Sequence, residues 1–416
     1  MKTVILLIGL LFSTFSLQAQ DYEDVMSEAY WKIWNSDVQA SINKNIEQYR
    51  KGDAELNIPS GVTVKIEQLS HSFIFGGNIF LFGQLETTQQ NRQYENTFGA
   101  LFNSATLPFY WKTLEPEQGK PRYTAGSSYI FRRPPVDPIL EFCESNKIMT
   151  KGHAIIYGMR RWGHPDWMPS DRKEMEFYFE KHIQELALRY KDRIQIWDVV
   201  NEPMDDGKTS DIKTGKGKTD LASDEFYWQD YFLTPKDYAV EAFKLARQYG
   251  NPDDKLFIND YNLEYSLNKC DGLIKYVEYI ESKGATVDGI GTQMHIAIDS
   301  NKDNIAQMFQ KLGATGKLIK VSELDIKVNT SSPTTENLAQ QAEMYQYVID
   351  MYKKYIPADK QYGITIWGVS DNEKEHVNWI PNDAPNLWDA NYARKHAYKG
   401  VADGLAGNDV SEDFTG

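Results

Sequence analysis

Short apolar runs alternate along most of the chain with longer segments in which apolar residues recur at helical spacing. Runs that are apolar at nearly every position are typical of strands in a parallel sheet, because helices cover both faces of such a sheet. Eight strands are predicted, at Phe73–Gly76, Ala105–Phe109, Met149–Ile156, Ile194–Val200, Leu256–Asn259, Gly289–His295, Leu318–Leu324 and Gly363–Trp367. The pattern therefore predicts an α/β fold, with the sheet closed into a (β/α)₈ TIM barrel.

Helical periodicity follows several of these strands. The predicted helices are Met175–Arg189, Pro235–Gln248, Cys270–Lys283, Asn304–Leu312 and Thr335–Lys354. Two segments do not follow the pattern: residues 206–229 are polar and rich in Gly and Lys, and residues 372–390 are rich in Trp, Pro and Asn. We expect both to be loops.

The first twenty residues have the features of an export signal. Lys2 supplies a positive start, Val4–Leu11 is an apolar run, and Leu17–Ala19 offers a small-residue cleavage site. The run is too short to cross a bilayer, and no later segment is apolar for long enough. We therefore expect residues 1–20 to be a signal peptide and the mature chain to be secreted or periplasmic, without a membrane span.

The remaining chain is expected to form one catalytic unit with extensions. Residues 21–70 are predicted to form an N-terminal extension, with a helix over 22–50 and a β-hairpin over 54–70. Residues 71–403 are predicted to form the barrel, and 404–416, which are small and acidic, a disordered tail.

Composition narrows the classes of partner. The formal net charge of −14 argues against nucleic acid, whose phosphates would be repelled. Most of the ten Trp and 25 Tyr are expected to lie in the core, but such an abundance is also what a cleft in which rings stack on sugars would need. The two cysteines are too few for a disulfide framework, and Cys143 is expected to be a buried free thiol. No spacing of His residues indicates a metal site, so we expect neither a metal nor a cofactor. We also expect the protein to be a monomer.

Two predicted strands end in a carboxylate, at Glu202 and at Glu323. In a TIM barrel the active site lies at the carboxyl ends of the strands, and strands four and seven lie nearly opposite each other. Two carboxylates roughly 5 Å apart across a pocket support cleavage of a glycosidic bond through a covalent intermediate. His295 ends strand six next to Glu323, and Asp325 is placed to orient its imidazole.

Five stretches of sequence resemble, in the right order, the motifs of glycoside hydrolase family 10, the retaining endo-1,4-β-xylanases. They are Trp197–Glu202, Asn259–Asn262, Gln293–His295, Ser322–Asp325 and Ile366–Asp371, followed by Trp379 and Leu387–Asp389. The resemblance covers roughly residues 70 to 400. It implies an enzyme that cleaves β-1,4-xylosidic bonds of xylan or a decorated xylan by double displacement, with a polysaccharide or oligosaccharide as its partner.

The resemblance also implies a role for each matching residue. Glu202 would protonate the leaving oxygen and then activate water, and Glu323 would attack the anomeric carbon. Asn201 would hold the 2-hydroxyl of the reacting sugar. The other substrate-binding residues that it implies are His153, Tyr261, Gln293, His295, Trp367 and Trp379.

The sequence departs from the family in two motifs. Along the second strand the family carries Glu, Asn and Lys, which grip the next sugar on the non-reducing side, and this chain has Thr106, Leu107 and Tyr110 there. In the third-strand motif Tyr157 and Gly158 replace a Trp-His pair, and an insertion follows.

The insertion leaves two questions open. The sequence does not decide whether His164 replaces the missing histidine. Arg160 and Arg161 either meet an acidic side group such as a uronic acid or form a solvated face. Two other functions also stay open: a β-glycanase or glycosidase acting on a different backbone, and a glycan-binding barrel without turnover.

Overall fold

The computed structural model describes residues 72–406 apart from 170, 207–210, 214–227 and 229–231, together with 40, 44, 55, 57 and 59–64. The predicted signal peptide, nearly all of the predicted N-terminal helix, about half of the predicted hairpin 54–70 and most of the predicted loop 206–229 lie outside the described residues. Residues 59–64 contain a turn and no strand.

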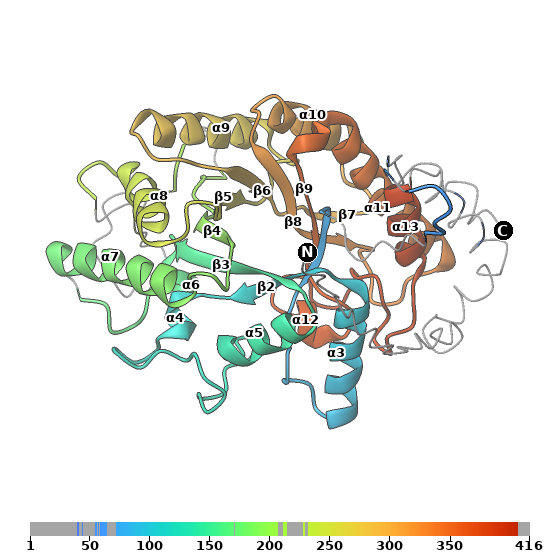
Figure 1. Ribbon diagram of the computed structural model, residues 1–416, viewed down its shortest axis with the longest axis horizontal. Helices are drawn as coiled ribbons and strands as arrows, with labels where there is room; N and C mark the ends of the chain where they lie inside the picture. Colours follow the sequence, from blue (N-terminus) through green and yellow to red (C-terminus); the bar gives the residue numbers. More distant parts are fainter. Residues whose placement is uncertain are drawn as a thin grey trace, which may run out of the picture.

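Eight parallel strands close into a barrel, which confirms the predicted (β/α)₈ fold (Figure 1). They are β1 (Ile74–Asn78), β2 (Ser104–Pro108), β3 (Met149–Tyr157), β4 (Ile196–Asn201), β5 (Lys255–Asp260), β6 (Gly289–Thr292), β8 (Leu318–Lys327) and β9 (Gln361–Ile366). The sheet runs in sequence order from β1 to β6. The barrel closes because β1 also pairs with β9, and β6 pairs with β8.

The sixth strand is not continuous, so the prediction of one strand over Gly289–His295 is wrong. It ends at Thr292, and a short strand β7 (His295–Ala297) pairs separately with β8. The interruption lies at Gln293 and Met294, where Met294 has a φ of +63°, a left-handed conformation that cannot continue a strand. The interruption places Gln293 and His295 at the rim of the barrel.

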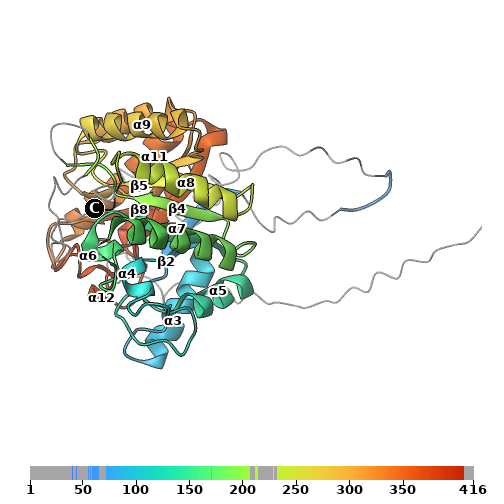
Figure 2. The same cartoon turned by 90° about the vertical axis from the view of Figure 1, so that its left-hand side faces the viewer.

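Helices surround the barrel on its outside, and neighbouring helices pack on one another in pairs (Figures 1 and 2). The five predicted helices are confirmed with small shifts: α7 (Arg172–Arg189), α8 (Asp237–Tyr249), α9 (Leu267–Ser282), α10 (Lys302–Gly313) and α11 (Thr335–Tyr355). Further helices are α3 (Thr88–Leu101), α4 (Trp111–Leu114), α5 (Val136–Ser145), α6 (Arg160–Gly163) and α13 (His396–Ala406), with a 3₁₀ turn at Ala358–Lys360. Helix α13 runs three residues into the predicted tail, and residues 407–416 lie outside the described residues.

Local sequence explains where several helices begin. Thr87 and Thr334 form capping boxes at the starts of α3 and α11, and the side chains of Asp171, Ser266 and Asn301 accept backbone N–H groups at α7, α9 and α10. Such caps satisfy donors that have no partner within the helix. The segment 372–390, predicted as a loop, contains the short helix α12 (Glu373–His376), capped by Asn372, so that prediction is wrong for these four residues.

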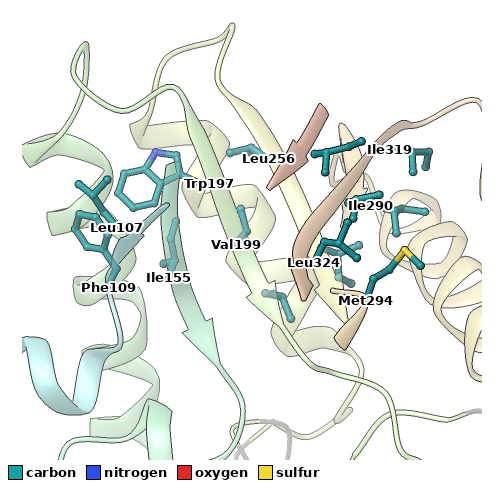
Figure 3. Packing of buried hydrophobic residues seen from close by; sticks show 14 of the residues in the cluster. Leu107, Phe109, Ile155, Trp197, Val199, Leu256, Ile290, Met294, Ile319 and Leu324 are labelled. Carbon is teal, nitrogen blue, oxygen red and sulfur yellow. The ribbon is translucent and has the colours of Figure 1, made fainter. Parts of the chain in front are cut away.

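The main core lies between the strands and the surrounding helices, and Figure 3 shows part of it, with Leu107 and Phe109 close to Trp197. Inside the barrel, Ile74, Ile196 and Phe257 pack together at the amino ends of their strands. Gly152 on β3 leaves room for the indole of Trp197, because a Cβ atom there would lie 2.1 Å from the ring. The amino end of the barrel is therefore a packed floor beneath the carboxyl rim.

Cys143 and Cys270 are both free and buried, as the sequence predicts for Cys143. In the described part of the chain, no helix is both long enough and apolar enough to cross a membrane.

Glu264, between β5 and α9, is expected to make stability depend on pH. Its side chain is buried, and neither carboxyl oxygen has a hydrogen-bond partner from another described residue. Burial raises its pKa from 4.5 to about 7. The folded state therefore favours the protonated carboxyl, so this contribution to stability is complete below pH 4.5 and is lost as the pH rises through 7.

We expect Glu264→Gln to raise the free energy of unfolding at pH 8.5 by on the order of 3 kcal/mol and to have little effect at pH 4.5. Urea unfolding at both pH values measures this difference. Glu278→Gln, at an exposed position on α9, is the matched control. An equal effect of Glu264→Gln at both pH values would show that Glu264 does not titrate as described.

Candidate active site

A pocket of about 270 Å³ opens at the carboxyl rim of the barrel. Both predicted carboxylates line it, and aromatic rings make up much of its wall. Its lining residues are Phe80, Tyr110, Arg132, Arg133, Tyr157, Trp162, Glu202, Tyr261, Gln293, His295, Glu323, Trp367, Asn378 and Trp379. Rings beside a few polar groups suit a sugar, which has apolar faces and polar edges.

Glu202 follows the last residue of β4, and its backbone N–H still donates to the carbonyl of Asn259 on β5. Its backbone has a φ of +52°, which is uncommon for a residue other than glycine. The Tyr157 hydroxyl donates to its Oε2 at 2.5 Å, and the Gln293 amide donates to its Oε1 at 3.0 Å. With 15% of its side chain exposed, Glu202 is accessible from the pocket.

Glu323 lies within β8 and is much more deeply buried, with 4% of its side chain exposed. The Asn259 amide donates to its Oε1 at 2.7 Å, and Nε2 of His295 lies 3.3 Å from its Oε2. Both oxygens therefore have fixed partners, which holds the carboxylate in one orientation.

Two asparagines connect the carboxylates. The Asn201 amide lies 3.4 Å from Oε1 of Glu202, and its Oδ1 accepts the Asn259 amide at 2.8 Å. Asn259 also donates to Glu323, and its own Oδ1 accepts the Ser322 hydroxyl. This network places both acids at one pocket and fixes the asparagine predicted to contact the 2-hydroxyl.

His295 is held as a cation beside Glu323. Its Nδ1 lies 2.8 Å from Oδ2 of Asp325, which also accepts the indole N–H of Trp379 at 2.8 Å. Burial by itself lowers the pKa of His295, but the carboxylates of Asp325 and Glu323 outweigh burial and raise it to about 10. The imidazolium therefore donates to both Asp325 and Glu323.

His153 is held from below by a buried ion pair. Oδ2 of Asp198 lies 2.7 Å from Nδ1 of His153 and 2.6 Å from Nζ of Lys151. Nε2 of His153 is 3.1 Å from the Tyr110 hydroxyl and 3.9 Å from Oε1 of Glu323. His153 thus lies behind the pocket wall, between Tyr110 and Glu323.

Tyr261 is positioned by charged neighbours. The ammonium of Lys269 lies 3.5 Å from the centre of its ring, and its hydroxyl donates to Asp206. Lys269 also pairs with Asp206 at 2.7 Å and with Asp260 at 3.1 Å. The ring is therefore fixed at the edge of the pocket near Glu202.

Of the residues predicted for the site, seven line the pocket: Glu202, Tyr261, Gln293, His295, Glu323, Trp367 and Trp379. His153, Asn201 and Asp325 lie directly behind them. Sequence reasoning missed Phe80, Arg132, Arg133, Trp162 and Asn378, and it noted Tyr157 only as a departure. Phe80, Arg132 and Arg133 belong to none of the sequence motifs, so their position at the pocket becomes evident only in the folded barrel.

The three residues that replace the second-strand motif lie in different places in the structure. Thr106 and Leu107 are buried, and Leu107 belongs to the core outside the barrel (Figure 3). Tyr110 lines the pocket. In the third-strand insertion, His164 is buried against the ring of Trp228, and its Nε2 lies 3.0 Å from the Gly158 carbonyl. His164 is therefore a structural residue and does not line the pocket.

Among the described residues, no group of three or more His, Cys, Asp or Glu side chains could hold a metal ion.

A TIM barrel with two carboxylates at an aromatic pocket on its carboxyl rim is an arrangement typical of glycoside hydrolases. The model for glycosyl hydrolase family 10 matches residues 71–404. The chain therefore belongs to this family, as the sequence motifs predict.

Individual relatives and a solved structure support this family assignment. The endo-1,4-beta-xylanase C of Paenibacillus barcinonensis is 29% identical over 73% of this chain and 28% of its own length. The exoglucanase XynX of Acetivibrio thermocellus is 32% identical over 64% of this chain and 24% of its own length. A solved structure, GH10 from Paenibacillus barcinonensis, superposes with a TM-score of 0.67 and 27% identity, covering 80% of this chain and 94% of that one. The chain thus spans about a quarter of the length of the first curated relatives.

Proposed function

We propose that the protein is a secreted or periplasmic, monomeric enzyme that hydrolyses β-1,4-xylosidic bonds in xylan or a decorated xylan by double displacement. The observation that carries this proposal is the pair of carboxylates, Glu202 and Glu323, held by one amide network at the same pocket. Several relatives are named endo-1,4-beta-xylanases, which supports xylan as the substrate.

The two carboxylates have environments that suit different tasks. Glu323 is buried, and Asn259 and His295 fix its oxygens, so it is oriented to attack the anomeric carbon. Glu202 is more exposed and is held by Tyr157 and Gln293, so it can reach the glycosidic oxygen. In the first step, Glu202 gives its proton to the leaving oxygen while Glu323 forms a bond to the sugar.

In the second step, Glu202 takes a proton from water, whose oxygen attacks the anomeric carbon and releases Glu323. In this proposal Asn201 holds the 2-hydroxyl, Gln293 and His295 contact the same sugar, and His153 supports this subsite from behind the pocket wall. Trp367 and Trp379 supply an apolar wall, and Tyr261 borders the side of Glu202. Asp325 acts indirectly, because it orients both His295 and Trp379.

A β-glycanase acting on another backbone is the second candidate. It is favoured by the loss of the second-strand grip, since Thr106 and Leu107 are buried away from the pocket, and by a relative named as an exoglucanase.

Release of reducing ends from a panel of polysaccharides separates the two candidates. We expect release from glucuronoxylan and arabinoxylan, and much less from mixed-linkage β-glucan, cellulose or mannan. The Glu323→Ala variant is the blank for contaminating activity. No release from any xylan, with release from another β-glycan, would refute the xylanase proposal and favour the alternative.

A further inference from the structure

Two adjacent arginines line the pocket although the chain as a whole carries a net charge of −14. Arg132 and Arg133 lie just before α5, in a segment that carries none of the family motifs. Arg160 and Arg161, for which the sequence leaves open either contact with an acidic side group or a solvated face, are not among the lining residues. Arg161 is exposed, and its guanidinium lies 4.9 Å from the centre of the Trp162 ring.

Arg132 is fixed in place by the segment around α12. Its side chain is buried and donates to the carbonyl oxygens of Lys374 and Glu375, and its guanidinium lies 4.4 Å from the centre of the Trp379 ring. Its own backbone N–H donates to Gln84 at 2.6 Å. Arg132 is therefore a rigid support for the residue that follows it.

Arg133 has a guanidinium that extends over the pocket wall. It lies 3.8 Å from the centre of the Tyr110 ring and 5.2 Å from that of Phe80. A guanidinium carries five N–H donors, and within the described residues one donation is found, from Nη1 to the carbonyl of Arg132. No carboxylate oxygen in the described part of the chain forms an ion pair with it within 4.0 Å.

A half-buried cation beside a second cation is costly in the free protein. Burial lowers the pKa of Arg133, and burial together with the charge of Arg133 lowers the pKa of Arg132 to about 9. An anion bound against these side chains would remove part of this cost. A carboxylate is the best match, because its two oxygens fit the planar fork of a guanidinium.

The position of Arg133 relates it to the reacting sugar. The Tyr110 hydroxyl is 3.1 Å from Nε2 of His153, which lies 3.9 Å from Glu323. A sugar bound beside Tyr110 and Arg133 is therefore a direct neighbour of the sugar that Glu323 attacks. We propose that Arg133 binds the carboxylate of a uronic acid carried by the substrate at this neighbouring position, so that the enzyme prefers acidic xylan fragments. This inference rests on the proposed function.

The test uses a matched pair of substrates: a xylo-oligosaccharide that carries glucuronic acid, and the same molecule with the uronic carboxyl reduced to a primary alcohol. We expect the wild-type protein to have a kcat/KM about 10-fold or more higher for the acidic form. In Arg133→Met, which keeps bulk over Tyr110 without charge, this ratio should fall to about one. Arg133→Lys keeps a charge without the fork and should retain part of the preference.

Arg161→Met is the matched control and should keep the wild-type ratio. Loss of the ratio in Arg161→Met, with the ratio intact in Arg133→Met, would transfer the role to the insertion. A wild-type ratio near one, or an equal loss on both substrates in Arg133→Met, would overturn the proposal. Thermal unfolding followed by circular dichroism confirms that each variant is folded.

Titration calorimetry with the Glu323→Ala variant separates this inference from the proposed function. If neither substrate is cleaved by the wild type, the proposed function fails. Tighter binding of the acidic form, lost on Arg133→Met in the same background, still supports the uronate site, and equal binding of the two forms refutes it.

Discussion

Replacing Glu323 with Ala is expected to reduce kcat on xylan by about four or more orders of magnitude while leaving the fold intact. The nucleophile is lost, and what remains is binding and proton transfer, which are ineffective without the covalent step. Initial rates with xylan and with an aryl β-xylobioside measure the loss. Glu278→Ala, which removes an exposed carboxylate on α9, is the matched control and should behave as wild type.

Chemical rescue sharpens this prediction. Azide is small enough to occupy the space left by the Glu323 side chain and to attack the anomeric carbon from the same face. With an activated aryl β-xylobioside, Glu323→Ala and azide should therefore yield the α-glycosyl azide. Normal activity in the variant without azide would refute the assignment of Glu323 as nucleophile.

Replacing Glu202 with Ala is expected to have an effect that depends on the leaving group. On xylan the variant should lose about a thousand-fold in kcat/KM, because a sugar alkoxide leaves slowly unless it is protonated. With a dinitrophenyl β-xylobioside, whose leaving group needs no proton, the loss in kcat/KM should be within about 10-fold. Comparison of kcat/KM on the two substrates measures the difference. Equal losses on both would contradict the acid/base role.

The barrel could be predicted because its strands depend on a local pattern. Runs such as Leu256–Asn259 are mostly apolar, and in the helices that follow such runs apolar residues recur at helical spacing, so burial on both faces of the sheet is visible in the sequence. The interruption of the sixth strand could not be predicted. Met294 adopts its left-handed backbone because the tertiary structure requires it. A glycine at this position would have indicated that conformation, but a methionine does not.

The centre of the site could be predicted because each key residue ends or lies within a strand with a recognisable motif, as for Asn201 and Glu202. The wall of the pocket could not. Arg132 and Arg133 come from an irregular segment, and their approach to Tyr110 and Trp379 depends on contacts with α12, more than two hundred residues away in the chain. Long-range contacts of this kind leave no periodic signal in a single sequence.

The stereochemistry of hydrolysis tests the central claim most directly. A ¹H NMR spectrum recorded within minutes of adding the protein to a xylo-oligosaccharide reports which anomer of the product forms first, before mutarotation mixes the two. Two successive inversions, by Glu323 and then by water, predict that the β-anomer appears first. If the α-anomer appears first, a single displacement by water has taken place, and Glu323 does not form a bond to the sugar.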